Sequence, residues 1–236
     1  MEYRWSLLTF NLAVAFGGNK CYNAFKGSVI MIKPYTTILI DMYGVILKES
    51  KGNFLPFVYN SFPESEHGRI TDIIRNKNMF TEAQLGRVSS HDFLSALGFG
   101  DTEKAMRDYI ETSLTLDEGF IPFAEKVCGR YRLVLLSNDV PEWSEYITEY
   151  FGLNKYFSHK IVSGNVGARK PDFKIFDDTL AIIGARPAEC IFVDNTAKNL
   201  VAAEEVGISP VLFDRDGDHY YGASVLNFEE LYNFIG

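Results

Sequence analysis

The sequence has few cysteines, and they are too far apart to form a cysteine-based site. Cys21, Cys128 and Cys190 are the three cysteines among 236 residues, and no CxxC pair occurs. A disulfide framework or a zinc site needs an even or clustered set of cysteines, so both are excluded. We therefore expect free thiols in a reducing compartment and a cytoplasmic location.

The chain also lacks an excess of positive charge. It carries 23 Lys and Arg against 31 Asp and Glu, a formal net charge of −8. Its basic residues are scattered, whereas binding of a nucleic-acid backbone needs clustered Lys and Arg. We predict no nucleic-acid partner. A small-molecule substrate with an anionic group would instead be met locally, by a lysine, by backbone N–H groups or by a metal ion.

The apolar stretch of residues 5–16 is too short and too interrupted to span a bilayer. Glu2 stands beside Arg4 in the flank that a signal peptide keeps positively charged. We therefore expect neither a signal peptide nor a membrane partner. Residues 1–30 are interpreted as a loosely ordered extension, or as sequence upstream of a working start at Met31, which leads directly into the first expected strand.

What the sequence does have is a regular alternation of strand and helix patterns. With 47% hydrophobic residues it can bury a sizeable core. Short apolar, β-branched runs are typical of buried parallel strands, and helical patterns lie between them in the C-terminal half. This alternation predicts an α/β fold with a Rossmann-like, doubly wound parallel sheet. The expected strands are 36–40, 132–136, 160–162, 189–193 and 209–213, and the expected helices between them are 142–151, 173–183 and 197–206.

Residues 47–118 differ from the rest because they contain helical patterns and no convincing buried strand. Ser89 has the position and chemistry of a helix N-cap. A helical insertion directly after the first strand would cover the carboxyl ends of the strands as a cap, which excludes water and selects substrates. The expected helices of this cap are 65–76, 81–84, 90–97 and 102–115. The predicted organisation is an N-terminal extension of residues 1–30, a Rossmann-like core of residues 31–46 and 119–236, and a helical cap of residues 47–118.

Polar residues follow four of the buried segments. Asp41 ends the first strand, just before a turn through Gly44. The other three segments are Ser137-Asn138-Asp139, Lys170-Pro171 and Asp194-Asn195. Open α/β sheets bind ligands at the carboxyl ends of their strands, so we expect these side chains to meet at one edge of the sheet. Taken singly, each of them also fits an ordinary turn or a surface loop.

These residue types suit a nucleophile that acts on an anionic group. A carboxylate such as Asp41 can attack phosphorus or an activated carbon and form a covalent aspartyl intermediate. Lys170 would neutralise both Asp41 and a bound anion, while Ser137 and Asn138 would donate hydrogen bonds to phosphate oxygens. Asp194 facing Asp41 would repel it unless a cation lay between them. Mg²⁺ accepts one or two carboxylates, a carbonyl and waters.

Together the four segments resemble the haloacid dehalogenase-like (HAD-like) superfamily of hydrolases over residues 35–236. The resemblance implies that Asp41 is the nucleophile, that Ser137 is the hydroxyl of the second motif and that Lys170 is the lysine of the third. It also implies that Asp194 is an acidic metal ligand, and that the helical insertion is the family's cap.

Two positions depart from the pattern of the family's phosphatases. Tyr43 stands where most of them have a second Asp, which protonates the leaving group, and a phenol with a pKa near ~10 is a poorer acid for this task. Tyrosine is instead found at this position in the metal-independent 2-haloacid dehalogenase branch. Asp194 matches the phosphatases, although Asn195 replaces a second acid. The resemblance places Tyr43 at the substrate, with its backbone carbonyl as a magnesium ligand beside Asp41.

Three functions follow from this mixture. The first is a Mg²⁺-dependent phosphatase, a monomer or homodimer that acts on a small phosphorylated metabolite through an aspartyl-phosphate at Asp41. The second is a 2-haloacid dehalogenase-type hydrolase that works through an ester of Asp41. The third is a catalytically weak binding protein with the HAD-like fold, motivated by the missing general acid. Retention of Asp194 favours the first.

Overall fold

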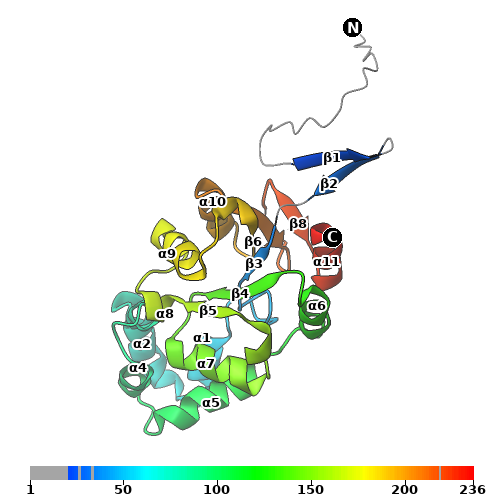
Figure 1. The fold of residues 1–236 in the computed structure, drawn as a ribbon. Helices are drawn as coiled ribbons and strands as arrows, with labels where there is room; N and C mark the ends of the chain where they lie inside the picture. The colour runs from blue at the N-terminus through cyan, green and yellow to red at the C-terminus, as the bar shows by residue number, and fades with distance from the viewer. Residues whose placement is uncertain (1–20, 26–27, 33–34, 218) are drawn as a thin grey trace. The chain divides into compact units, whose positions relative to one another are not determined.

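The computed structural model describes residues 21–25, 28–32, 35–217 and 219–236, and the chain divides into the units Met1–Pro34 and Tyr35–Gly236 (Figure 1). In the first unit, β1 (Cys21–Phe25) pairs antiparallel with β2 (Ser28–Ile32). Neither strand is predicted from the sequence. The apolar stretch of residues 5–16, with most of the predicted extension, lies outside the described residues.

The second unit is built on a six-stranded parallel sheet with the strand order β5-β4-β3-β6-β7-β8. Parallel sheets are covered on both faces, which is why the central strands are continuous apolar runs in the sequence. The predicted doubly wound, Rossmann-like α/β fold is confirmed. The strands are β3 (Thr37–Ile40), β4 (Arg132–Ser137), β5 (His159–Val162), β6 (Cys190–Asp194), β7 (Ser209–Phe213) and β8 (Ala223–Val225).

Helices cover both faces of this sheet. In Figure 1, α9 (Phe173–Ile183) and α10 (Ala197–Glu205) lie on one side, and α6 (Phe120–Val127) and α11 (Phe228–Ile235) lie on the other. No helix in the described ranges is both long and apolar enough to cross a membrane. The remaining helices of the core are α7 (Pro141–Tyr150) and α8 (Ser163–Val166), with the 3₁₀ turns η3 (Asn154–Tyr156) and η4 (Pro187–Glu189).

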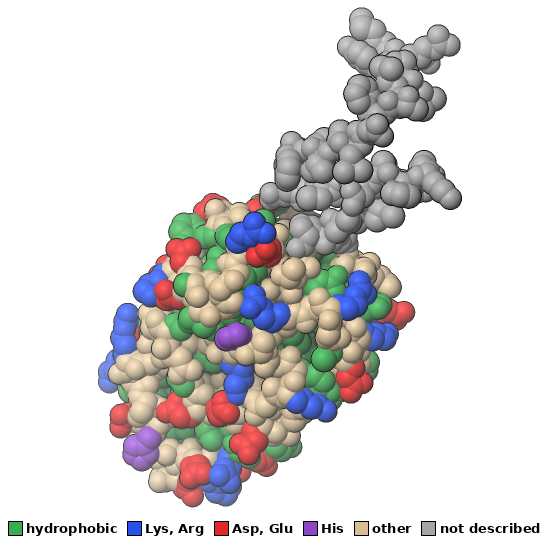
Figure 2. Space-filling view, viewed as in Figure 1, with side chains coloured by type: hydrophobic (Ala, Val, Ile, Leu, Met, Phe, Trp, Pro, Cys, Tyr) green, Lys and Arg blue, Asp and Glu red, His purple; other side chains and the backbone are tan. Residues whose placement is uncertain are grey.

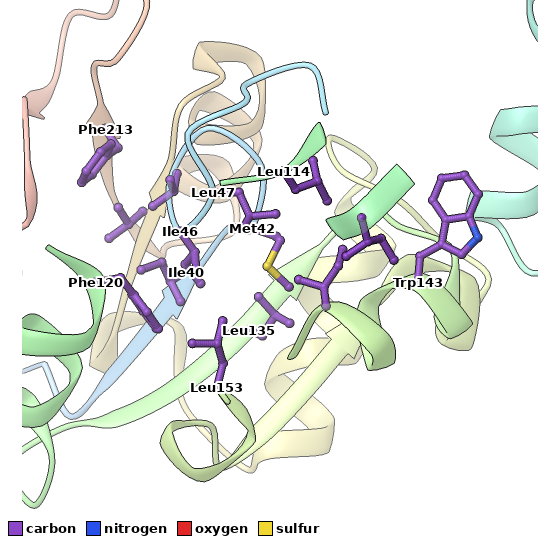
Figure 3. Close-up of a cluster of buried hydrophobic side chains, with 14 of the residues drawn as sticks. Ile40, Met42, Ile46, Leu47, Leu114, Phe120, Leu135, Trp143, Leu153 and Phe213 are labelled. Carbon is purple, nitrogen blue, oxygen red and sulfur yellow. The ribbon is translucent and has the colours of Figure 1, made fainter. Parts of the chain in front are cut away.

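The strand side chains alternate between two buried clusters, one on each face of the sheet. Ile40 belongs to the larger cluster, which also takes in Phe120 and Trp143, and Figure 3 shows these side chains around the central strands. Leu39, the neighbour of Ile40, points to the other face and packs in the cluster of α9 and α10. This period of two fixes the register of β3 in the sheet.

Between β3 and α6 lies the helical insertion. Two of its helices begin at side-chain caps: Ser89 accepts a hydrogen bond from the Asp92 N–H at 3.0 Å, and Asp101 accepts one from the Lys104 N–H at 2.9 Å. The N-cap predicted at Ser89 is confirmed. The elements are α1 (Phe54–Ser61), η1 (Glu64–Glu66), α2 (His67–Thr71), the π-helical η2 (Asp72–Asn76), α3 (Met79–Gln84), α4 (Ser90–Leu97) and α5 (Thr102–Ser113).

Trp143 of α7 joins the inserted helices to the core. The indole is fully buried, and its Nε1 donates to Ser90 Oγ at 2.7 Å. Its ring centroid lies 4.9 to 6.2 Å from the centroids of four rings. These rings come one each from α1, α3, α4 and α5, and they are Phe54, Phe80, Phe93 and Tyr109. One aromatic cluster therefore binds most of the insertion to α7.

Charged side chains are mixed by sign over the face of the molecule in Figure 2. Blue basic and red acidic side chains alternate there without a large area of one sign. This distribution corresponds to the scattering of basic residues along the sequence.

Candidate active site

Asp41 directly follows β3, in the middle of the sheet. Its backbone N–H donates to the Val193 carbonyl of β6 at 3.0 Å, and its Oδ1 accepts from the Met42 N–H at 2.8 Å. The chain then turns at Gly44, where φ is 80° and a Cβ would lie 2.2 Å from Asn195 Nδ2. Glycine alone fits this turn, both for its conformation and for its space. The turn therefore packs directly against the end of β6.

Lys170 joins the carboxylates that end β3 and β6. Its Nζ lies 2.7 Å from Asp41 Oδ1 and 2.7 Å from Asp194 Oδ2, and it also donates to the Leu136 carbonyl at 2.9 Å. The exposed fractions are 8% for Asp41, 2% for Lys170 and 0% for Asp194. The structure thus brings together three residues that are far apart in the sequence, at the edge of the sheet where they are predicted to meet.

Two carboxylates share one ammonium in this cluster, which affects how each group titrates. Burial raises the pKa of Asp41 to about 7, and repulsion from Asp194 adds to this, against the opposing effect of Lys170. Burial would lower the pKa of Lys170, but attraction to Asp194 and Asp41 outweighs it, so the pKa lies above its ordinary value. The lysine is therefore charged at neutral pH, and the buried cluster is short of positive charge.

Asp194 is held by the first turn of α10. Its Oδ1 accepts from the Thr196 N–H at 2.8 Å, and Asn199 Nδ2 lies 3.2 Å and 3.1 Å from its two oxygens. Together with Lys170, these donors fix the orientation of the carboxylate. Asn199 is thus a supporting residue for Asp194, one that the sequence offers only as a polar residue one turn into a helix.

Asn138 and Ser137 end β4, and the structure places them differently. Asn138 lines the cavity described below, but its Oδ1 accepts from the Lys170 N–H at 2.8 Å and its Nδ2 donates to the Lys170 carbonyl at 2.9 Å. Its amide therefore holds the backbone of Lys170. Ser137 is fully buried and is not among the residues that line the cavity, and its Oγ has no hydrogen-bond partner among the described residues. A buried hydroxyl without a partner is costly, so its hydrogen-bonding capacity is left open at this edge.

Tyr43 lines the same cavity, two residues after Asp41. Its hydroxyl donates to Asp139 Oδ1 at 3.2 Å. Burial, together with the nearby Asp139, raises the pKa of Tyr43 well above its ordinary value. The phenol is therefore a weak proton donor in this setting, in agreement with the poor acid expected from the sequence.

Asp139 is a buried carboxyl to which no role is assigned from the sequence. It is 1% exposed, and its Oδ2 has no partner among the described residues. Burial raises its pKa to about 8, although hydrogen bonds from Val140 and Tyr43 act in the opposite direction. The residue follows Ser137 and Asn138, where Asp is common in turns, and nothing in that pattern signals its burial.

We expect the stability of the protein to fall with rising pH because of Asp139, and Asp139→Asn tests this. The folded-state pKa of about 8 lies above the value near ~3.9 of an unfolded chain. The contribution of this carboxyl is therefore complete below about pH 4 and is lost as the pH rises towards 8. Asn mimics the neutral form, so between pH 5 and pH 7 the variant should gain about 2.5 kcal/mol relative to wild type. Urea unfolding at both pH values measures this, and an unchanged difference between the two proteins would contradict it.

A cavity of about 380 Å³ opens onto Asp41 and Lys170. The inserted helices supply aromatic walls, namely Phe54 of α1, Phe80 of α3 and Tyr109 of α5. The opposite wall is polar and comes from the ends of the strands and the start of α10. A concave site with apolar walls and a few convergent polar groups is typical of a small-molecule site.

The chemistry of the donor set fits Mg²⁺. The described residues contain no group of three or more His, Cys, Asp or Glu side chains that could hold a metal ion. Magnesium needs fewer protein ligands than this, because it keeps several waters and accepts one or two carboxylates together with substrate oxygens. Asp41 and Asp194 offer only oxygen atoms, at a place that is short of positive charge.

Two carboxylates and a lysine meet at the carboxyl edge of a doubly wound sheet that carries a helical insertion. This arrangement is typical of a hydrolase with a carboxylate nucleophile. The sequence model of the haloacid dehalogenase-like hydrolases matches residues 35–207. The chain therefore belongs to this family, as the resemblance of its motifs predicts, and it is an enzyme of the hydrolase class.

Individual relatives include proteins of more than one activity. The chain is 31% identical over 206 residues to the chloroplast protein flavin mononucleotide hydrolase 1 of Arabidopsis thaliana, covering 85% of this chain and 82% of that one. A HAD family enzyme from Bacteroides thetaiotaomicron, solved with magnesium and inorganic phosphate, superposes with a TM-score of 0.66 at 18% identity, over 78% of this chain and 96% of the other. An L-2-haloacid dehalogenase superposes with a TM-score of 0.65 at 17% identity, over 85% and 98%. The fold is therefore shared with a structure that holds magnesium and inorganic phosphate and with a dehalogenase.

Proposed function

We propose that this protein is a Mg²⁺-dependent phosphatase that acts on a small phosphorylated metabolite through an aspartyl-phosphate at Asp41. The observation that carries the proposal is the contact of Asp41 and Asp194 with the one Nζ of Lys170, where Asp41 and Lys170 face a cavity. The activity named for the Arabidopsis relative, hydrolysis of flavin mononucleotide, supports a phosphoric monoester as the substrate.

The reaction would take place in two displacements at phosphorus. In the first, a carboxylate oxygen of Asp41 forms a bond to phosphorus while the bond from phosphorus to the ester oxygen breaks, and the alcohol leaves after taking up a proton. In the second, a water oxygen attacks phosphorus, the bond to Asp41 breaks, and inorganic phosphate is released with the carboxylate restored.

The neighbouring residues would hold the phosphoryl group and the nucleophile in position. The charge of Lys170 favours the ionised form of Asp41 and attracts the phosphoryl oxygens, Ser137 offers an open hydroxyl, and Asn138 keeps Lys170 in place. When bound by Asp41, the Tyr43 carbonyl and Asp194, Mg²⁺ would neutralise charge on the phosphoryl oxygens.

Protonation of the leaving group is the least supported step of this chemistry, because Tyr43 replaces the usual acid and its hydroxyl donates a hydrogen bond to Asp139. The proton would therefore come from the substrate or from water. Turnover should depend steeply on the acidity of the leaving alcohol, with aryl phosphates well ahead of alkyl phosphates.

Tyr43 is also the observation that favours a dehalogenase, because a halide leaves without a proton. Against a dehalogenase, the chain retains Asp194, which is fully buried at the end of β6. A catalytically weak binding protein is the third candidate. For it, we expect a phosphorylated ligand to raise the thermal stability without turnover.

The decisive measurement is a screen of phosphoesters and 2-haloacids, with Mg²⁺ and with EDTA. We expect phosphate release from p-nitrophenyl phosphate in Mg²⁺ and at least a tenfold loss in EDTA. Restoration by added Mg²⁺ controls for damage by the chelator. Halide release from 2-chloropropionate in EDTA, with no phosphate release under any condition, would replace the proposal by the dehalogenase.

The organisation of the protein is part of the same proposal. We assign residues 35–46 and 119–236 to the core and residues 47–118 to a cap over the cavity; residues 31–34, which are predicted from the sequence to belong to the core, lie in the first unit. We also propose a monomer or homodimer in the cytoplasm that binds neither nucleic acid nor membranes.

A further inference from the structure

Three cationic side chains line the cavity and form no ion pair among the described residues. Arg169 directly precedes Lys170, Lys51 follows the turn after β3, and Lys198 lies in the first turn of α10. Elsewhere cations are commonly paired, as Arg186 is with Glu189. Unpaired cations at one cavity favour a ligand that carries a further anionic group, in addition to the group bound at Asp41 and Lys170.

Arg169 is the member of this group whose surroundings point most clearly to a ligand. Its guanidinium makes one hydrogen bond, from Nη1 to Thr81 Oγ1 of α3 at 3.2 Å, and its buried Nε has no partner in the described part of the chain. A guanidinium carries five N–H donors, and burying part of it without acceptors is costly. Arg215 shows the contrast, because it donates to two carbonyls and pairs with Asp117.

The inserted helices contribute aromatic rings to the lining of the cavity. The rings of Phe54 and Phe80 are stacked with centroids 5.3 Å apart, and Tyr109 lies edge-on to Phe54. The Tyr109 hydroxyl donates to the Gly52 carbonyl at 2.5 Å, so the polar end of this ring is already occupied. Such a wall is suited to contact with a planar or extended apolar group.

We propose that the leaving group of the substrate carries a flat apolar part, which packs on Phe54 and Phe80, and a second anionic group, which Arg169 binds. This inference rests on the proposed phosphatase function. Lys51 and Lys198 are exposed and add positive potential at the opening. A second anionic group would supply an acceptor for the Arg169 Nε, which has no partner among the described residues.

A matched pair of substrates tests the second anion. Benzyl phosphate with a para carboxylate and its methyl ester share the ring, the leaving oxygen and nearly the same size, and differ in one charge. For wild type, we expect kcat/KM to be at least about tenfold higher for the carboxylate than for the methyl ester, mainly through a lower KM. A hydrogen bond to a charged group contributes enough free energy for a tenfold difference. In Arg169→Gln this ratio should fall towards one.

Arg75→Gln is the control, because Arg75 is an exposed arginine of η2 that does not line the cavity. This variant should keep the wild-type ratio. A wild-type ratio near one would overturn the inference. So would an equal loss for both substrates in Arg169→Gln, which would show that Arg169 serves the phosphoryl group or the fold near Lys170.

A binding measurement separates this inference from the proposed function. The Kd values of the acid and of the ester are measured for Asp41→Asn, with and without Arg169→Gln, so that no turnover is needed. A preference for the acid that depends on Arg169 would support the second-anion site even if no phosphate is released. Equal Kd values, together with rapid hydrolysis of p-nitrophenyl phosphate by wild type, would overturn the site and leave the phosphatase standing.

Discussion

Asp41→Asn should lower phosphate release from an activated aryl phosphate at least a thousandfold. An amide oxygen is a far weaker nucleophile than a carboxylate, so the covalent route is lost and only unassisted attack by water remains. The measurement is kcat for p-nitrophenyl phosphate in Mg²⁺, with a single-turnover assay for a phosphorylated enzyme. Wild type should accumulate acid-stable phosphate on the protein, and the variant should not.

The same variant should stay folded, which separates loss of chemistry from loss of structure. Because burial raises the pKa of Asp41 to about 7, a neutral amide at this position relieves repulsion with Asp194 and should not lower the stability. Asp216→Asn, at an exposed aspartate, is the matched control and should retain wild-type turnover. More than a tenth of wild-type activity in Asp41→Asn would rule out Asp41 as the nucleophile.

Lys170→Met should destabilise the fold by about 3–5 kcal/mol, besides removing activity, because deletion of one partner leaves uncompensated buried charge. Both carboxylates lose their shared ammonium, which is 2.7 Å from each of them. Denaturant unfolding at pH 7 gives the free energy of unfolding. The deficit should shrink at acid pH, where Asp41 is protonated and no longer needs the lysine.

Two further variants make the result specific to this cluster. Lys174→Met removes a half-exposed lysine of α9 that pairs with Asp178, and it should cost no more than about 1 kcal/mol. Adding Asp194→Asn to Lys170→Met should recover part of the lost stability, because one of the two unpaired charges is removed. A loss below about 1 kcal/mol in Lys170→Met would mean that the carboxylates find another partner.

The parallel sheet was predictable because each central strand is buried on both faces and therefore forms an apolar run. β8 (Ala223–Val225) was missed, since an edge strand of three residues has too little pattern to identify. The helix α1 (Phe54–Ser61) was missed because its start has no side-chain cap and Pro56 interrupts its pattern. The hairpin of β1 and β2 is not predicted from the sequence, although Ser28–Ile32 is a short apolar run with β-branched residues.

The meeting of Asp41, Lys170 and Asp194 was predictable from topology, since parallel strands put their carboxyl ends at one edge. The hydrogen bonds around these residues were not predictable from the sequence. The engagement of the Asn138 amide with the backbone of Lys170, and the burial of Asp139 beside Tyr43, depend on how loops from different strands pack. Spacing in one sequence does not record such contacts between segments.

The aromatic cluster around Trp143 has a consequence for how molecules enter and leave. Swinging the insertion outwards would part the indole from the rings of α1, α3, α4 and α5, each of which buries about 150–250 Å². At ~25 cal/mol per Å², exposing even two such rings costs several kcal/mol. Entry of a ligand through a fixed opening of the cavity therefore costs less free energy than outward rotation of the inserted helices. A fixed aperture selects ligands by their size and shape before any chemical group is tested.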